Sequence, residues 1–240
     1  MIILTAGHTG PHTGAQSITT QFDEGSETIW LRNRIAEILT NKYGLVVLMD
    51  NDTASLKLLT KALTEDLSHT EPEVLNLGEK LTDNTEDAVA ALAENIFIND
   101  FEQSEKSNSV HSVSSVREKS NSVRKTTFLI DIHFNAHSNP QARGTETIVS
   151  DHATTLELRF ASHLAHTTAH ALGIPLRGIK SESQTPHHRL AILHITPQSI
   201  ILEVCFCTSL EDVEAYRNNR EKLAADLAWA IAELILDRMT

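Results

Sequence analysis

The sequence predicts an α/β protein built as a single domain, with a twisted, mostly parallel (mixed) sheet and helices on both faces. Short, β-rich apolar runs alternate with longer segments of helical periodicity, which is typical of this fold class. The apolar runs are nearly continuous, as expected for strands that helices cover on both sides. They predict strands at residues 2–5, 45–49, 127–132, 146–149 and 200–204.

Three longer segments carry apolar residues at helical spacing. The first helix is expected to begin near Ser26 and Glu27 and to end before Gly44, which suits the left-handed conformation that follows many helices. The second is expected at residues 156–172 and the third at residues 222–238. Each would turn its apolar stripe toward the sheet.

Residues 102–125 do not fit a compact fold. They are polar and Ser-rich, and the hexapeptide Glu-Lys-Ser-Asn-Ser-Val occurs twice, at 105–110 and 118–123. Such a stretch cannot bury enough apolar surface to offset the entropy lost on ordering. We expect a flexible surface insertion within one domain spanning residues 1–240. A partner-binding or phosphorylated loop is the alternative.

Composition excludes several classes of protein. The formal net charge of −12 argues against nucleic acid as a partner. Two cysteines imply no disulfide framework. No apolar run approaches the ~20 residues of an integral membrane segment, and no charged and apolar signal peptide opens the sequence. The expected site of synthesis is therefore the cytoplasm.

Four metal-competent or acidic residues stand at the ends of predicted elements. His8 follows the first strand, His133 follows the third, and Glu203 lies in the last, while Glu27 stands at the start of the first helix. Ligands of α/β sheets gather at the carboxyl ends of strands. Each residue alone also has a structural explanation, as a hydrogen-bonded histidine, a first-turn acid or a paired carboxylate.

Read together, the motifs around these residues resemble the zinc-dependent N-acetylmuramoyl-L-alanine amidases. The family's Gly-His-Gly-Gly turn is similar to Gly-His-Thr-Gly at 7–10, and its helix-starting Glu is matched by Glu27. The family's Ser-Ile-His-Ala-Asn-Ala strand end is similar to Asp-Ile-His-Phe-Asn-Ala at 131–136. A Gly-Thr-Glu-Thr strand follows at 144–147, and Leu-Glu-Val-Cys-Phe at 202–206 resembles the last signature.

By that resemblance His8, Glu27 and His133 are expected to hold one Zn²⁺ ion, and Glu203 is expected to be the catalytic acid and base. Two imidazoles and one carboxylate leave the fourth tetrahedral position open, as in catalytic zinc sites. Zinc in such a site activates water and polarises an amide carbonyl. Glu203 would take a proton from water and pass it to the leaving nitrogen.

Two assignments at this site stay open. Glu24 is a rival to Glu27 as the third ligand, although Glu27 is preferred because it stands at the expected start of the helix. Cys205 could compete for zinc, although a small buried side chain is the favoured interpretation.

Other polar residues have functional and structural explanations. His163, His166 and His170 lie on one face of the second helix, where two of them could chelate a metal, although a polar helix face is the favoured explanation. From the resemblance, Asn135, His188 and Arg189 are expected to contact the substrate.

The resemblance implies hydrolysis of the amide between the lactyl group of N-acetylmuramic acid and L-alanine, in peptidoglycan or a muropeptide. The chain resembles the endolysin form of the family, which phages or prophages encode and which acts on the cell wall after release. Two alternatives stay open, namely a zinc hydrolase for another peptide or acyl amide and a non-enzymatic peptidoglycan-binding module. The sequence does not indicate an oligomeric state.

Overall fold

A six-stranded sheet forms the centre of the computed structural model, which describes residues 2–8, 12–45, 47–50, 127–139, 141–196 and 198–236. These residues belong to one compact unit, formed by residues 1–54 and 122–240. A second unit, residues 55–121, lies outside the described residues, and so does the Ser-rich insertion expected at 102–125.

The strands follow the order β4 (Val47–Met49), β1 (Ile2–Ala6), β5 (Phe128–Asn135), β8 (Gln198–Phe206), β6 (Thr145–Val149) and β7 (Leu176–Ser181). All neighbours in this sheet pair in parallel except β6 and β8, which are antiparallel. The short strands β2 (Gln16–Ser17) and β3 (Phe22–Asp23) form a separate antiparallel pair. The predicted mixed, mostly parallel sheet is therefore confirmed.

The five predicted strands are all present, but β7 was not predicted. Its sequence, Leu-Arg-Gly-Ile-Lys-Ser, contains a glycine and two basic residues instead of an apolar run. It is an edge strand with no fully buried residue, so burial imposes no hydrophobic pattern on it.

Three long helices pack beside the sheet in the described part of the chain, namely α1 (Glu24–Tyr43), α5 (Thr155–Leu172) and α6 (Leu210–Leu236). Helix α1 ends at Gly44, whose φ of 65° is left-handed, as predicted. Helix α6 begins well before the expected residue 222, because the apolar pattern does not mark its polar first turns. Only Asp212, Val213 and Tyr216 are buried between residues 210 and 221.

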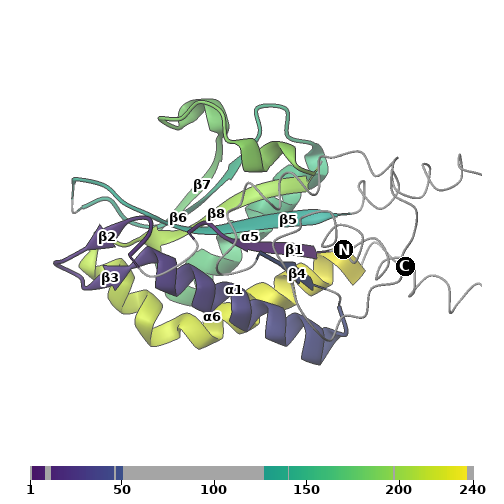
Figure 1. Cartoon of the computed structure of the whole chain (residues 1–240), viewed down its shortest axis with the longest axis horizontal. Helices are drawn as coiled ribbons and strands as arrows, with labels where there is room; N and C mark the ends of the chain where they lie inside the picture. Colours follow the sequence, from purple (N-terminus) through teal and green to yellow (C-terminus); the bar gives the residue numbers. More distant parts are fainter. Residues whose placement is uncertain are drawn as a thin grey trace, which may run out of the picture. The chain divides into compact units, whose positions relative to one another are not determined.

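The helices form one layer, because α6 packs against both α1 and α5, and all three contact the sheet (Figure 1). Alternate residues of β5 point into this layer, so that the rings of Phe128 and Phe160 lie 4.8 Å apart. On the opposite face the 3-10 turn η3 (Ala191–His194) contacts β8. Among the described residues, the helical layer expected on that face is not found.

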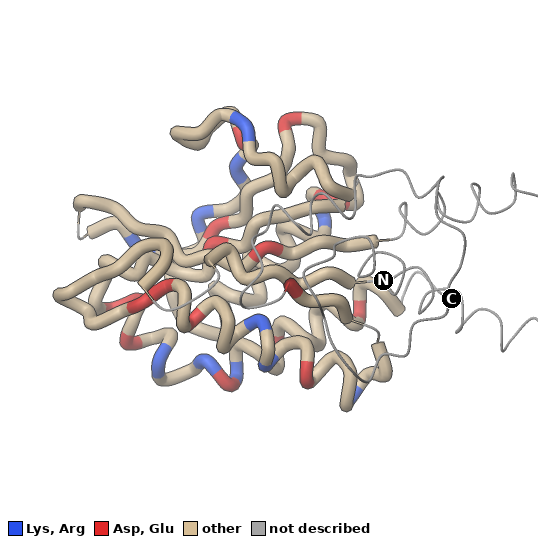
Figure 2. The backbone as a smooth tube through the Cα atoms, viewed as in Figure 1, with Lys and Arg blue, Asp and Glu red and all other residues tan. Residues whose placement is uncertain are grey.

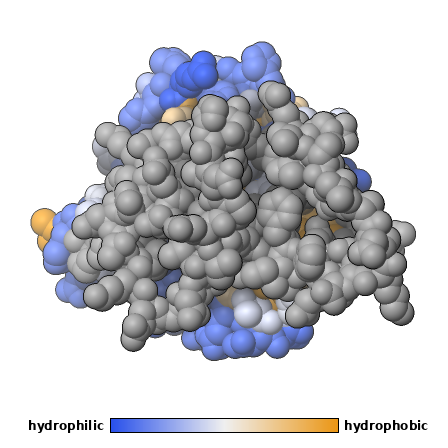
Figure 3. Space-filling view, turned by 45° about the vertical axis from the view of Figure 1, so that its right-hand side comes forward, coloured by the Kyte–Doolittle hydropathy of each residue, from blue (hydrophilic) through white to orange (hydrophobic). Residues whose placement is uncertain are grey.

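The described surface seen in Figure 3 is mostly hydrophilic, and hydrophobic residues show only in small, separate areas. None of the described helices is long and apolar enough to cross a membrane.

Candidate metal centre and active site

His8 follows β1 directly, at the carboxyl end of the sheet. The N–H of Gly7 donates to the carbonyl of Ile132 at 2.8 Å and so extends the pairing of β1 with β5. A Cβ at Gly7 would collide with the ring of His133, and a Cβ at Gly14, whose φ is +74°, would collide with the ring of His8. These two glycines therefore leave the room that both imidazoles occupy.

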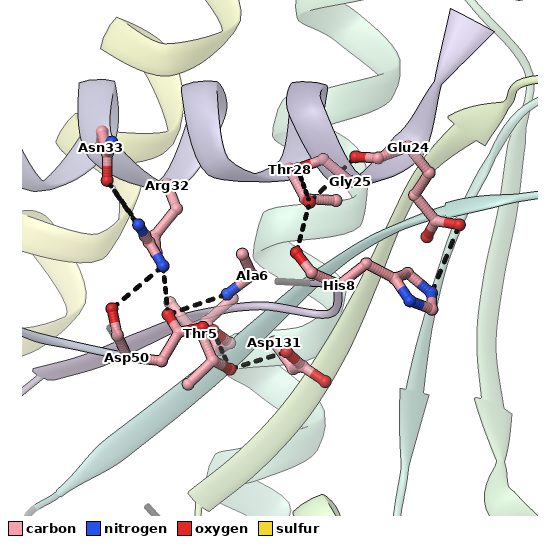
Figure 4. A network of polar contacts seen from close by, with 11 residues as sticks. Thr5, Ala6, His8, Glu24, Gly25, Thr28, Arg32, Asn33, Asp50 and Asp131 are labelled. Carbon is pink, nitrogen blue, oxygen red and sulfur yellow. Dashed lines mark hydrogen bonds and ion pairs between the residues drawn. The ribbon is translucent and has the colours of Figure 1, made fainter. Parts of the chain in front are cut away.

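A buried polar network fixes the strands beneath His8 (Figure 4). The guanidinium of Arg32 pairs with Asp50, whose Oδ1 also accepts the N–H of Ala6 at 3.1 Å. Thr5 Oγ1 donates to Asp131 Oδ1 at 2.7 Å and so links β1 to β5. Removing one partner of a buried ion pair typically costs about 3–5 kcal/mol. The network therefore links the end of β1 to α1 and β5.

Glu24, the first residue of α1, lies between the two histidines. Its Oε2 lies 3.4 Å from His8 Nε2, and its Oε1 lies 3.3 Å from His133 Nδ1. The backbone N–H groups of Ala15 and Phe134 donate to the same carboxylate at 2.6 and 2.9 Å. Burial acts to raise the pKa of Glu24, but these donors and His133 outweigh it, so its pKa is lowered and the carboxylate stays charged.

His133 is held by carboxylates on both edges of its ring. Its Nε2 lies 2.9 Å from Asp131 Oδ2, and its Nδ1 faces Glu24. Burial acts to lower the pKa of His133, but the two carboxylates outweigh it and raise the pKa well above the usual range. Burial dominates at His8, whose pKa is lowered. The negative potential that favours a charged imidazolium at His133 equally favours a metal cation.

The donor atoms of His8, Glu24 and His133 all lie within 4.8 Å of one another, in the only such group of three in the described part of the chain. Zinc bonds nitrogen and carboxylate oxygen at about 2.0–2.2 Å, so a modest contraction would bring all three donors onto one ion. Two imidazoles and one carboxylate are the donor set of a catalytic zinc site with an open fourth position. The residues present therefore fit the metal that the sequence predicted.

Glu27, the preferred third ligand in the sequence, points away from this group. Its Oε2 accepts from Tyr216 Oη at 3.0 Å and from Arg220 Nη1 at 3.3 Å, both on α6. Helix α1 begins at Glu24 because β3 ends at Asp23, immediately before it. The carboxylate that starts the helix is therefore Glu24, three residues before Glu27. The geometry favours the rival, Glu24.

Glu203 lies on β8 directly opposite His133 of β5 in the parallel ladder. Its Oε2 is buried and has no hydrogen-bond partner. Burial raises the pKa of Glu203 to about 7, against the opposing effect of His133 and with further contributions from Glu24 and Glu146. An unpartnered carboxyl group that titrates near neutrality can both accept and donate a proton.

A second polar cluster flanks Glu203 on its other side. Glu146, opposite Glu203 on β6, is buried and accepts from Asn135 Nδ2, Arg177 Nε and Lys180 Nζ at 2.9, 2.6 and 2.8 Å. Asn135, an expected substrate contact, thus turns its amide toward Glu146. The sequence pattern assigned no role to Glu146, Arg177 or Lys180, because their contacts depend on the order of the strands in the sheet.

The other expected substrate contacts, His188 and Arg189, lie exposed in the turn before η3. Glu182 anchors this turn, because its carboxylate accepts the N–H of Leu190 at 2.8 Å and contacts His194 Nε2 at 3.0 Å. Within the described residues, no contact of His188 or Arg189 reaches the His8, Glu24 and His133 group. Their role in substrate binding stays a prediction.

The competing metal ligands take structural positions. Cys205 is fully buried in the core that faces the helices. A bulge in the β5–β8 ladder accompanies this position, so that Cys205 does not share the side of Glu203. On α5, His166 Nδ1 contacts the carbonyl of Ser162 at 2.8 Å, and His163 pairs with Glu233 at 3.4 Å. His166 lies exposed, as the favoured polar face of α5 requires, whereas His163 is half-buried beside the ring of Trp229 on α6.

Comparisons with known proteins agree with this geometry. A profile of the N-acetylmuramoyl-L-alanine amidase family matches residues 2–237. No curated protein matches the chain by sequence. Several solved structures have a similar fold. Their sequence identities to this chain are low, so the similarity concerns the fold alone.

One similar structure is an N-acetylmuramoyl-L-alanine amidase from Clostridium difficile 630, with a TM-score of 0.59 and 20% identity, covering 99% of this chain and 95% of its own. Another is a putative amidase of the same name from Neisseria meningitidis, with a TM-score of 0.60, 22% identity, and coverage of 96% and 93%. The catalytic domain of the CD27L endolysin targeting Clostridia difficile has a TM-score of 0.50, 20% identity, and coverage of 98% and 96%.

Proposed function

The chain belongs to the N-acetylmuramoyl-L-alanine amidase family, hydrolases of the amide between the lactyl group of N-acetylmuramic acid and L-alanine, and we propose that it works with one zinc ion held by His8, Glu24 and His133. The observation that carries this proposal is the position of the Glu24 carboxylate, 3.4 Å from one imidazole and 3.3 Å from the other. When bound, zinc would supply a Lewis acid that polarises the amide carbonyl and activates water.

We assign the proton transfers to Glu203. Its unpartnered Oε2 and its pKa of about 7 support a group that accepts a proton from the attacking water and then donates it to the leaving nitrogen of L-alanine. Its position opposite His133 in the ladder supports this assignment. Asp131 supports the same arrangement, because its carboxylate fixes the ring of His133 and leaves Nδ1 directed toward the metal position.

The substrate we propose is peptidoglycan or a muropeptide, met outside the inner membrane in the manner of an endolysin. The fold shared with an endolysin catalytic domain agrees with this setting. Lysis of outer-membrane-permeabilised cells by added protein would support it, whereas digestion of isolated muropeptides without any lysis would restrict the proposal to a soluble substrate.

Purified sacculi test the reaction directly. The zinc-loaded protein should release free stem peptides that begin with L-alanine and leave intact glycan strands, as judged by mass spectrometry. New reducing sugar ends or cleavage within the peptide would instead point to another hydrolase. Sacculus binding without any product would indicate a non-enzymatic module.

A further inference from the structure

A row of paired residues crosses the sheet from His133, in the proposed metal centre, to the edge strand β7. His133 on β5 lies opposite Glu203 on β8, Glu203 lies opposite Glu146 on β6, and Glu146 lies opposite Gly178 on β7. Residues paired across a ladder present their side chains on the same face. Glu203 therefore stands between the metal ligands on one side and the cluster around Glu146 on the other.

That cluster carries more positive than negative charge. Glu146 supplies one carboxylate, which is 3% exposed, and Arg177 and Lys180 supply two cations, which are 35% and 36% exposed. One cation balances the buried carboxylate, so one positive charge is left over. Figure 2 shows basic positions along the edge strand β7, whose neighbour β6 carries Glu146. This excess occurs in a protein with a formal net charge of −12.

Both cations keep donors for a further ligand. The ammonium of Lys180 has three N–H groups, and its bond to Glu146 uses one of them. Arg177 donates through Nε to Glu146 and through Nη1 to the carbonyl of Arg143, while its guanidinium lies over the ring of Phe206 at 4.9 Å. These contacts hold the two head groups in place, and about one third of each side chain still meets solvent.

We propose that Arg177 and Lys180, held on Glu146, form a subsite for a carboxylate of the stem peptide. This inference rests on the proposed amide hydrolysis, because it places the leaving L-alanine at Glu203. A peptide advances about 3.3–3.6 Å per residue, so the α-carboxylate of the residue after L-alanine lies about 7 Å beyond the cleaved bond. Neighbouring strands are about 5 Å apart. The long side chains of Arg177 and Lys180 reach from β7 inward to Glu146, so they can contact a carboxylate about 7 Å from the cleaved bond at Glu203.

The part of the substrate that this subsite would bind is the peptide and not the glycan. N-acetylmuramic acid loses its lactyl carboxylate when it forms the amide, so the negative charges near the cleaved bond belong to the peptide. A hydrogen bond to a charged group strengthens binding about tenfold or more. The subsite would therefore distinguish a second residue with a free α-carboxylate from the same residue in its amidated form.

Paired muropeptides test this proposal. Turnover is measured on N-acetylmuramoyl-L-Ala-D-Glu and on the analogue with the α-carboxylate amidated, with the zinc-loaded wild type, with Lys180→Gln, and with Lys222→Gln. Lys222 pairs with Asp226 on the solvent-facing side of α6, which makes it the matched control. The wild type should prefer the free acid about tenfold in kcat/KM. Lys180→Gln leaves Arg177 to neutralise Glu146 and should remove most of that preference by raising KM for the free acid. Lys222→Gln should keep the preference.

Two results would overturn the subsite, namely no preference in the wild type, or an equal loss on both substrates in Lys180→Gln. The second result would mean that Arg177 and Lys180 only neutralise the buried carboxylate of Glu146. Binding of both muropeptides to Glu203→Gln, measured by calorimetry, separates this outcome from failure of the proposed function. If neither muropeptide is cleaved but the free acid still binds more tightly, the subsite stands and the reaction is wrong. If neither is cleaved and both bind equally or not at all, both proposals fail.

Discussion

Asp131 Oδ2 lies 2.9 Å from His133 Nε2, on the edge of the ring opposite the Nδ1 atom that faces Glu24. A carboxylate in this position fixes the tautomer and the orientation of a ligating imidazole and makes it a stronger donor. The amidase signature that residues 131–136 resemble has Ser at the place of Asp131. The buried carboxylate therefore adds a charge beside the proposed metal position.

Asp131→Asn should weaken zinc binding about 10- to 100-fold, because the amide can still accept from Thr5 but no longer carries the charge. Competition with a chromogenic chelator measures the affinity, and chemical denaturation of the metal-free protein checks the fold. Wild-type zinc affinity in a folded Asp131→Asn variant would show that the carboxylate does not act through His133.

Zinc affinity should rise with pH across the neutral range. The carboxylates around His133 raise its pKa in the metal-free protein, so zinc must displace a proton from it. Below that pKa the logarithm of the binding constant should rise by about one for each pH unit. His8, whose pKa is lowered by burial, should add little to this slope. Calorimetry in buffers of different ionisation enthalpy counts the released protons, and no release at pH 7 would contradict the assignment.

Glu203→Gln should retain zinc and lose about 10²- to 10⁴-fold in kcat, the usual contribution of a general acid and base. The amide has the same shape as the carboxyl group but cannot carry the proton. Glu221→Gln, at an exposed carboxylate of α6 that pairs with Arg34, is the matched control and should keep full activity. Turnover of Glu203→Gln at the wild-type rate would remove Glu203 from the mechanism.

Glu157→Gln should stabilise the protein above neutral pH. Glu157 closes the capping box of α5, its Oε1 is buried without a partner, and burial raises its pKa from 4.5 to about 7. The folded state therefore binds this proton more tightly than the unfolded state, and stability is lost as the pH rises from about 4.5 to about 7. Gln keeps the capping box without the charge.

The gain should be on the order of 1–3 kcal/mol at pH 8 and close to zero at pH 4. Urea unfolding at both pH values measures it. A gain of the same size at both pH values would show that the effect is unrelated to this titration.

Much of the fold could be predicted because burial imposes a pattern on the sequence. The strands at the centre of the sheet are continuous apolar runs, and each of them was predicted. Strand β7 carries Arg177, Gly178 and Lys180 and lies half-exposed at the edge, so no apolar run marks it. The sequence could not indicate that these residues meet Glu146, because that contact depends on strand order.

The candidate site was predicted in part for the same reason. His8 and His133 follow strands that the apolar pattern predicts, and Glu203 lies within one. The choice between Glu24 and Glu27 depends on the first residue of α1, and helix boundaries are the least certain part of a sequence-based assignment. Because β3 ends directly before Glu24, the helix begins there, and Glu27 turns instead toward Tyr216 of α6.

The zinc content of two matched variants tests the central claim most directly. Glu24→Gln and Glu27→Gln change the same chemical group three residues apart on α1, and both amides can still accept a hydrogen bond. After dialysis against zinc-free buffer, elemental analysis should find wild-type zinc, one ion per chain, in Glu27→Gln and strongly reduced zinc in Glu24→Gln. Retained zinc in a folded Glu24→Gln variant, with loss in Glu27→Gln, would contradict the account.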